Sequence, residues 1–332
     1  MRPVRSILTM LCALLGACAT SQDAALSRGA DIVTLADGVH WLPGRFERER
    51  QPDGNSLLLE GRDGIVVVDS GRHAEHSAAL VEWARRKGRP IVAVINSHWH
   101  LDHLGGNAHL RREFPQLQAH ASAAIDRALA TTMQRSIADL QAMLDDRATD
   151  AATRRMVQVD LALLEQRSAL APDRHLDGPA HDTRIGGREL RVGVEVGAVS
   201  GGDAWVLDRA SGILAVGDFV TLPVPFLDTA CTPGWRAAMG RIESLPFDRL
   251  LPGHGAVMDR ADFRRYRGAL EHLLDCAASD RPVADCSAGW IADLGPLLPE
   301  ASQRAARGML AHYFTQHLRA PPAQRDRFCP AP

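Results

Sequence analysis

The chain has 332 residues, a formal net charge of -2 and 45% hydrophobic residues. This length and hydrophobic content are sufficient for a large core, so we expect one compact unit of enzyme size. The near-neutral charge gives no support for nucleic-acid binding, which requires a basic surface. The sequence also lacks low-complexity runs and short-period repeats.

The N-terminal residues have the pattern of an export signal. Arg2 and Arg5 precede an apolar stretch, residues 7–15, which is too short to span a bilayer as a stable helix. The stretch leads into Leu-Gly-Ala-Cys, ending at Cys18. This ending resembles a bacterial lipoprotein signal, in which Cys18 is lipidated. The alternative is an ordinary secretory signal cleaved near Ala19.

The lipoprotein resemblance implies where the mature protein lies. We expect residues 1–18 to be the signal and residues 19–30 to be a polar tether. The mature chain is then periplasmic and held on a membrane by its lipid anchor. Ala19 after the cysteine favours the outer membrane over the inner one. No other stretch of the sequence is long and apolar enough to span a membrane.

The hydrophobic patterns predict strands and helices in alternation. Strands are expected over residues 32–35, 38–42, 56–60, 65–69 and 91–95, with helices over 74–87 and 106–113. Residues 122–166 are charged and rich in Ala and Leu, without Gly or Pro, and predict two or three helices. They are either a solvated spacer or a lid over the active site. Strands return over residues 189–196, 204–207 and 213–216, and residues 261–320 are expected to be helical.

The most informative motif is His98-Trp99-His100-Leu101-Asp102-His103, which directly follows the apolar strand 91–95. Side chains alternate along an extended chain, so His98 and His100 point the same way. Asp102 and His103 follow where the chain turns, and they can face a neighbouring point. The segment can therefore supply ligands to two adjacent metal positions. Zinc is the expected ion, since imidazole nitrogen and carboxylate oxygen are its usual ligands in catalytic sites.

This motif resembles the signature of the metallo-β-lactamase superfamily. Further segments agree with the family in order and spacing, namely residues 64–71, 105–107, 213–218 and 251–255. The resemblance covers roughly residues 31–260 and implies an αββα sandwich, a two-sheet α/β fold. It further implies a helical insert at about residues 122–175. Residues 261–332 are then a C-terminal helical extension packed on this domain.

The resemblance also implies roles for individual residues. The first metal position would use His98 and His100, and the second would use Asp102, His103 and His254. Asp218 would bridge the two positions. Asp102 would also act in catalysis, by orienting the attacking water or accepting its proton. Asp69 is expected either to accept the free N–H of a ligand histidine or to serve only as a turn former at a strand end.

One position departs from the family pattern. Val199 stands where the family carries a histidine ligand of the first metal position. In one interpretation, only the second position holds a metal. In another, both positions fill, and an extra water or a distant His175 or His181 replaces the missing ligand. In the third, catalysis is lost and the scaffold is kept for binding.

These observations predict a zinc-dependent hydrolase with one or two ions and a small-molecule substrate. Water activated by the metal would attack an ester, thioester, lactone or lactam. The alternative is a catalytically impaired metal-binding or accessory protein of a periplasmic system.

The cysteines beyond the signal fit an oxidising compartment. Cys276 and Cys286 flank a polar loop that contains a proline, and we expect them to form a disulfide. Cys231 and Cys329 then remain, either to pair with each other or to stay free.

Overall fold

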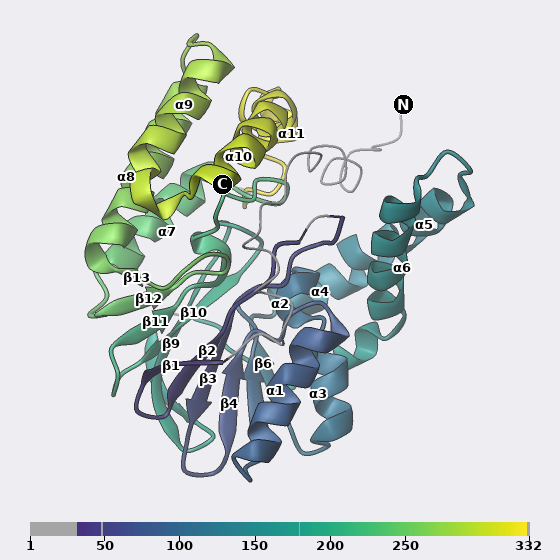
Figure 1. The fold of residues 1–332 in the computed structure, drawn as a ribbon, viewed down its shortest axis with the longest axis vertical. Coiled ribbons are helices and arrows are strands. Elements are labelled where there is room, and N and C mark those ends of the chain that lie inside the picture. The colour runs from purple at the N-terminus through teal and green to yellow at the C-terminus, as the bar shows by residue number, and fades with distance from the viewer. Residues whose placement is uncertain (1–31, 48, 179, 331–332) are drawn as a thin grey trace.

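The computed structural model describes residues 32–47, 49–178 and 180–330. The predicted signal and its Cys18 lie outside these residues. Two β-sheets pack face to face, and helices cover the outer face of each (Figure 1). The expected αββα architecture is therefore confirmed. In the described part of the chain, no helix has the length and apolar character needed to cross a membrane.

The first sheet contains the strand that leads into the histidine motif. Its strands, in spatial order, are β1 (Val33–Ala36), β2 (Val39–Leu42), β3 (Ser56–Glu60), β4 (Ile65–Val68), β5 (Ile91–Ile95), β6 (Gln118–Ala121) and β7 (Arg174–His175). The strands from β1 to β4 pair antiparallel, and those from β4 to β7 pair parallel. β4 and β5 are continuous apolar runs because both faces of this sheet are covered.

The parallel strands are joined by helices, which brings their carboxyl ends to one edge of the sheet. Helix α1 (Ala74–Arg86) connects β4 to β5. The short α2 (Leu101–Leu104) and α3 (Asn107–Glu113) connect β5 to β6. Leu80, Val81 and Trp83 of α1 pack on the outer face of the sheet. Residues that follow β4 and β5 therefore meet at the same edge.

The second sheet has the order β13 (Met258–Asp259), β12 (Arg249–Leu251), β11 (Ile213–Ala215), β10 (Asp203–Asp208), β9 (Arg188–Glu195) and β8 (His181–Ile185). Gly186 and Gly187 join β8 to β9 with φ angles of 58° and 79°. A two-residue hairpin loop with both angles positive requires residues such as glycine. The two glycines therefore allow the tight connection between β8 and β9. β11 and β12 are parallel, so their ends also share an edge.

The core between the sheets is built from the inward side chains of both. Val66, Val68 and Ile95 of the first sheet belong to one buried cluster with Val206 and Leu251 of the second. Burying a side chain of this size contributes about 1.5–3 kcal/mol. The same packing holds the site-bearing edges of the two sheets against each other.

The insert between β6 and β7 consists of three helices, in agreement with the two or three helices predicted for this segment. They are α4 (Ala124–Ala130), α5 (Thr132–Asp145) and α6 (Ala151–Glu165), followed by a 3-10 turn, Arg167–Ala169. Asp150 caps α6 by accepting hydrogen bonds from the backbone N–H groups of Ala152 and Thr153. A separate buried cluster that includes Ile125, Leu140 and Val157 holds the insert together.

The remaining helices form the C-terminal part of the chain. They are α7 (Thr232–Glu243), α8 (Arg260–Ala277), α9 (Val283–Leu294), α10 (Glu300–Tyr313) and α11 (Pro322–Arg325), with 3-10 turns at Gly217–Phe219 and Gly295–Leu297 and a π-helical turn at Phe314–Leu318. Trp235, Phe263 and Trp290 are buried in the cluster on the outer face of the second sheet. The C-terminal helices therefore share a core with the sandwich and are not a separate unit.

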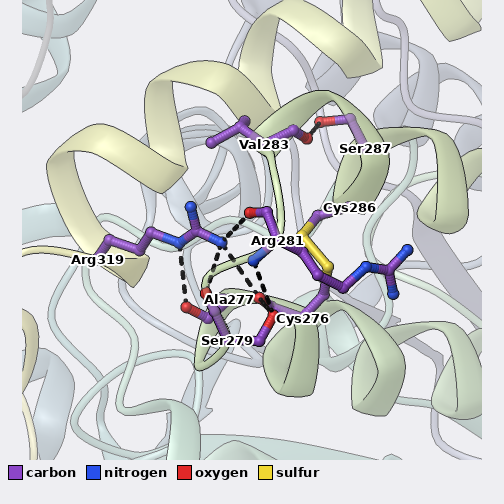
Figure 2. Close-up of a disulfide and its surroundings, with 8 residues drawn as sticks. All are labelled: Cys276, Ala277, Ser279, Arg281, Val283, Cys286, Ser287 and Arg319. Carbon is purple, nitrogen blue, oxygen red and sulfur yellow. Dashed lines mark hydrogen bonds between the residues drawn. A yellow bond between two sulfur atoms is a disulfide. The ribbon is translucent and has the colours of Figure 1, made fainter.

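Two disulfides hold this region. Cys276 is bonded to Cys286, the pair favoured by the sequence, and Cys231 is bonded to Cys329. Figure 2 shows Arg319 reaching the loop of the first disulfide. Its guanidinium donates hydrogen bonds to the carbonyl oxygens of Cys276, Ala277, Ser279 and Arg281. The chain after the π-helical turn is thereby tied to the α8–α9 connection.

Candidate metal centre and its cavity

The histidine motif begins three residues after β5. The Nε2 atom of His98 lies 2.7 Å from Nδ1 of His100, so these two side chains meet as predicted from their spacing. Asp102 and His103 lie on the short helix α2, whereas the sequence indicates only a turn there. The helical turn still aims both side chains at a neighbouring point. Nε2 of His103 is 3.6 Å from Oδ2 of Asp102.

Residues from the second sheet complete both groups. Nε2 of His254 lies 3.0 Å from Oδ2 of Asp102. Asp218 follows β11 and stands between the groups. Its Oδ2 is 3.6 Å from Nε2 of His98, and its Oδ1 is 3.2 Å from Nε2 of His103. The structure thus brings together the six residues predicted as ligands, with Asp218 in the bridging place.

Two buried atoms of this cluster have no hydrogen bond to any described residue, namely Nε2 of His103 and Oδ1 of Asp218. Leaving such atoms unsatisfied costs on the order of 1–3 kcal/mol each. A divalent cation between them would satisfy both. The absence of a side chain at Gly253 leaves room for the Asp218 carboxylate, since a Cβ at position 253 would lie 2.1 Å from Oδ1 of Asp218. The donor set of imidazole nitrogens and carboxylate oxygens therefore fits zinc or a similar transition metal.

The carboxylates of the cluster carry negative charge for a cation. Burial acts to raise the pKa of Asp102, but the charges of His103, His254 and Arg72 outweigh it and hold that pKa well below its ordinary value. For Asp218, burial is likewise outweighed, chiefly by His103 and His254, and its pKa is also lowered. Both side chains are consequently ionised across the physiological pH range.

Asp69 and Ser97 orient two of the ligand histidines. Oδ2 of Asp69 accepts hydrogen bonds from Nδ1 of His103 at 2.8 Å and from the Ser97 hydroxyl at 2.7 Å. That hydroxyl in turn lies 2.9 Å from Nδ1 of His98. These contacts place a proton on Nδ1 of each ring and leave Nε2 free for a metal. Asp69 has a φ of 59°, a conformation that Asp tolerates better than most residues, so it both turns the strand end and orients a ligand.

Thr229 performs the same task for His100, although it lies in no motif that the sequence reveals. Its hydroxyl donates to the carbonyl oxygen of Val199 at 2.9 Å and lies 2.9 Å from Nε2 of His100. Because the hydroxyl proton is used, the oxygen accepts the Nε2–H of His100 and leaves Nδ1 free. Position 199 thus serves the centre through its backbone, while the valine side chain is buried.

The distant histidines do not replace the missing ligand. His175 is exposed and forms an ion pair with Asp126 at 2.6 Å. His181 is exposed on β8 and, like His175, belongs to none of the metal-ligand clusters of the described residues. The expectation that either compensates for Val199 is therefore wrong. Among the described residues, His98, His100 and Asp218 face the first position.

Arg72 and Asn55 also position parts of the site, and the sequence does not reveal either of them. Nη2 of Arg72 lies 3.6 Å from Oδ1 of Asp102, and its Nη1 contacts Asp160 of α6, which links the insert to the metal centre. The side-chain amide of Asn55 donates to the carbonyl oxygens of Pro252 and Gly255 at 2.9 Å each, on both sides of His254. Neither residue lies in a recognisable motif, so only the tertiary structure reveals their roles.

Four of the six predicted ligands, His100, Asp102, Asp218 and His254, line a cavity of about 240 Å³. The insert lines it with Met133, Leu140 and Leu164, and the loop after β11 contributes Leu222 and Phe226. The C-terminal region adds Met309, Tyr313 and Phe328. Trp99, which lies between two of the predicted ligands in the motif, also lines this cavity. Among the described residues of the lining, Arg72 is the only Lys or Arg.

Comparisons with known proteins agree with this geometry. The family model for the metallo-beta-lactamase superfamily matches residues 50–254, more than half of the chain. A metallo-beta-lactamase from Pontibacter korlensis superimposes with a TM-score of 0.53 at 18% identity, covering 73% of this chain and 98% of that one. At such identity the likeness concerns the fold alone.

Two curated relatives share shorter segments. An (R)-specific secondary-alkylsulfatase from Pseudomonas sp is 32% identical over 79 residues, covering 23% of this chain and 12% of the relative. A hydroxyacylglutathione hydrolase from Xanthomonas campestris pv. campestris is 40% identical over 69 residues, covering 20% and 26% respectively. The chain thus spans only a small part of either relative. The family match, the fold and the converging ligands lead to one conclusion: the chain belongs to the metallo-beta-lactamase superfamily.

Proposed function

We propose that the protein is a zinc-dependent hydrolase of an ester-type bond, acting on small molecules with a bulky apolar group. The observation that carries this proposal is that the cluster of six predicted ligands opens onto a largely apolar cavity, whose lining includes four of them, His100, Asp102, Asp218 and His254. An apolar substrate group would fill the space lined by Leu140, Phe226 and Met309. The bond to be cleaved would then lie at the histidine and aspartate cluster.

The chemistry divides between the bound ion and the side chains. A divalent metal, when bound, lowers the pKa of a water towards neutrality and polarises a substrate oxygen. Asp102 accepts a hydrogen bond from the attacking water and orients it towards the substrate. Arg72 keeps Asp102 ionised and in place. Leu140 and the other apolar wall residues exclude bulk water, which strengthens the electrostatic interactions in the site.

The cavity favours a neutral ester, thioester, lactone or lactam over an alkyl sulfate. The relatives with matching segments are named for alkyl sulfates and for hydroxyacylglutathione. A sulfate ester carries a permanent charge that an arginine or lysine would recognise. The guanidinium of Arg72 already contacts Asp160 and Asp102, so it is not available for a second anion. We therefore place the preference on uncharged acyl groups.

A substrate series tests the proposal. Zinc-loaded protein is assayed with nitrophenyl esters of increasing acyl length, matched thioesters, a lactone, a lactam and an alkyl sulfate. We expect activity that rises with acyl length, disappears with chelator and is lost in Asp102→Ala and His254→Ala. Circular dichroism verifies that both variants remain folded. Absence of turnover in every class, with metal bound, would contradict the proposal.

Val199 favours a second candidate, a metal-binding protein with impaired catalysis. Metal content per chain separates the two, measured beside a Val199→His variant. One ion in the wild type and two in the variant, with activity in both, supports a hydrolase that works from the second position. Metal without activity in the wild type, and activity gained in the variant, supports the impaired protein.

The proposed setting is the periplasm, with the chain held on a membrane through lipidated Cys18. The two disulfides, Cys231–Cys329 and Cys276–Cys286, support an oxidising compartment. Cell fractionation with radiolabelled fatty acid tests it. We expect label and membrane association in the wild type and neither in Cys18→Ala. A cytoplasmic, unlabelled wild-type protein would contradict the anchor.

A further inference from the structure

A second group of potential metal ligands lies apart from the six already described. It consists of Asp228, in the loop after β11, with His312 and His317 from the C-terminal helices. One ligand atom from each residue lies within 4.8 Å of the other two. Nε2 of His317 is 2.8 Å from Oδ1 of Asp228. Asp228 precedes His312 by 84 positions and His317 by 89. Tertiary folding alone therefore brings the three residues together.

The π-helical turn brings the two histidines to one side. Residues five apart on an α-helix point about 140° away from each other. The turn Phe314–Leu318 widens the helix, and the Arg319 N–H bonds the carbonyl oxygen of Phe314, five residues earlier. Such π-helical turns are rare and occur frequently at functional sites. Here the turn places His317 against Asp228, with the His312 and His317 ring centroids 6.3 Å apart.

The surroundings match those of a metal site. The hydroxyl of Tyr313 donates to Oδ2 of Asp228 at 3.3 Å, which leaves Oδ1 directed at His317. Carboxylate ligands are commonly held in this way. The ring nitrogens of His312 make no hydrogen bond to any residue that the structure describes.

An ordinary ion pair accounts for only part of this arrangement. An aspartate and one histidine would form such a pair without His312, as His272 and Asp293 do on the surface at 2.9 Å. A tetrahedral zinc ion with bonds of about 2.0–2.2 Å spaces its ligands roughly 3.3–3.5 Å apart. The ligand atoms of Asp228, His312 and His317 lie within 4.8 Å of one another, so the contraction needed for this spacing is at most about 1.5 Å.

We propose that Asp228, His312 and His317 form an additional binding site for a divalent transition metal such as zinc. Three protein ligands leave a fourth position open, as in catalytic zinc sites. The site borders the substrate cavity, since Asp228 and His312 line it. The site would also join the C-terminal helices to the loop that carries Thr229, the hydrogen-bond partner of His100. It does not depend on which reaction the protein catalyses.

Zinc stoichiometry tests this site without reference to activity. Purified protein is stripped with chelator, equilibrated with buffered micromolar zinc and measured by mass spectrometry for metal per chain. We expect His312→Gln and His317→Gln each to bind one equivalent less than the wild type. The same loss should occur when His312→Gln is added to Asp102→Ala, because the additional site is separate from the main centre. His272→Gln, which removes a surface histidine beside one carboxylate, should retain the wild-type stoichiometry.

Cobalt provides a second readout, because its visible absorption reports the geometry of each site. Wild-type protein should show a component that disappears in His312→Gln. This variant removes no hydrogen bond within the described residues, so it decides the question if His317→Gln fails to fold. Equal zinc stoichiometry and equal cobalt spectra in wild type and folded His312→Gln would overturn the proposal.

Discussion

The hydrogen-bond partners of the ligand histidines determine which ring nitrogen each one offers. His98 and His103 present Nε2 because their Nδ1–H groups donate hydrogen bonds to Ser97 and Asp69, respectively. His100 presents Nδ1 because its Nε2–H donates a hydrogen bond to the hydroxyl of Thr229. This alternation suits residues that approach the metal from different directions. The partner residues therefore matter almost as much as the ligands.

Thr229→Val should weaken the first metal position selectively. The substitution keeps the shape of the side chain but removes the acceptor of the His100 N–H and leaves the Val199 carbonyl unpaired. We expect zinc affinity at that position to fall about 10–100-fold, with the second position unchanged. Competition titration against a zinc chelator measures both. Thr229→Ser restores the hydroxyl and should restore affinity, and an unchanged Thr229→Val titration would refute this role.

His76 should make stability depend on pH. It is buried on α1 with Nε2 2.8 Å from the Ser56 hydroxyl, and burial lowers its pKa to about 4, against 6.5 in an unfolded chain. Between these values the unfolded state binds the extra proton, so stability is full above pH 6.5 and falls as the pH drops towards 4. The loss approaches about 3 kcal/mol.

Urea denaturation of metal-free protein at pH 7, 5.5 and 4.5 measures this loss. His76→Gln retains a polar group near Ser56 but does not titrate there. The variant should therefore lose less stability than the wild type over the same pH range. Parallel pH profiles for the two proteins would show that His76 makes no such contribution.

At the scale of secondary structure, local sequence was sufficient where burial is continuous. β3 and β5 have the expected bounds, since their apolar runs end at polar or glycine-rich positions. Asp102 and His103 lie on a helix too short to leave a periodic pattern, so the sequence indicated only a turn. The six residues that converge in the structure were nevertheless named from the sequence, because their chemistry is concentrated in short motifs.

The residues that the sequence did not reveal act across long separations. Arg72 contacts Asp160 of the insert, and Asn55 holds the loop around His254. No local pattern distinguishes such an arginine or asparagine from a surface residue. The sequence likewise does not identify the cavity wall, since residues 122–166 fit either a solvated spacer or a lid. Met133, Leu140 and Leu164 line the cavity, which places the insert over the site.

Leu140→Ser should separate apolar binding from the chemical step. Leu140 is 4% exposed on α5 and lines the cavity. Loss of its side chain removes about 1.5–3 kcal/mol of apolar contact, so KM for long-chain esters should rise roughly 10–100-fold. Short-chain esters do not reach the insert and should keep their kcat/KM. Gln141→Ser, an exposed neighbour, is the control. Equal effects on both ester lengths would indicate damage to the metal centre instead.

At the scale of the whole molecule, the C-terminal region closes the cavity that the sandwich begins. Cys231 precedes α7, and Cys329 lies next to Phe328 of the cavity wall. Arg327 donates to the carbonyl oxygen of Asp228, which lies beside Thr229. The end of the chain is therefore attached to the loop that orients a metal ligand. Sequence alone left Cys231 and Cys329 unassigned because their separation of 98 residues carries no local signal.

The two disulfides should differ in their effects on stability and on the site. In the chain-entropy account, removing a crosslink stabilises the unfolded state more when the closed loop is longer. The separations are 98 residues for Cys231–Cys329 and 10 for Cys276–Cys286. Replacing both cysteines of a pair by serine should therefore cost about 2 kcal/mol more for the first pair. Urea midpoints and slopes of the two double variants measure this difference.

The same variants test whether the C-terminal region is part of the substrate site. The Cys231→Ser/Cys329→Ser protein frees the segment that carries Phe328, so its KM for long-chain esters should rise while its metal content stays unchanged. The Cys276–Cys286 disulfide lies in the α8–α9 connection, where Arg319 also bonds the loop carbonyls (Figure 2). Because Arg319 still holds this loop, loss of the disulfide should leave KM unaltered. If both double variants keep the wild-type KM although the first is less stable, the tail serves only to stabilise the fold, and the cavity is completed by the sandwich and its insert.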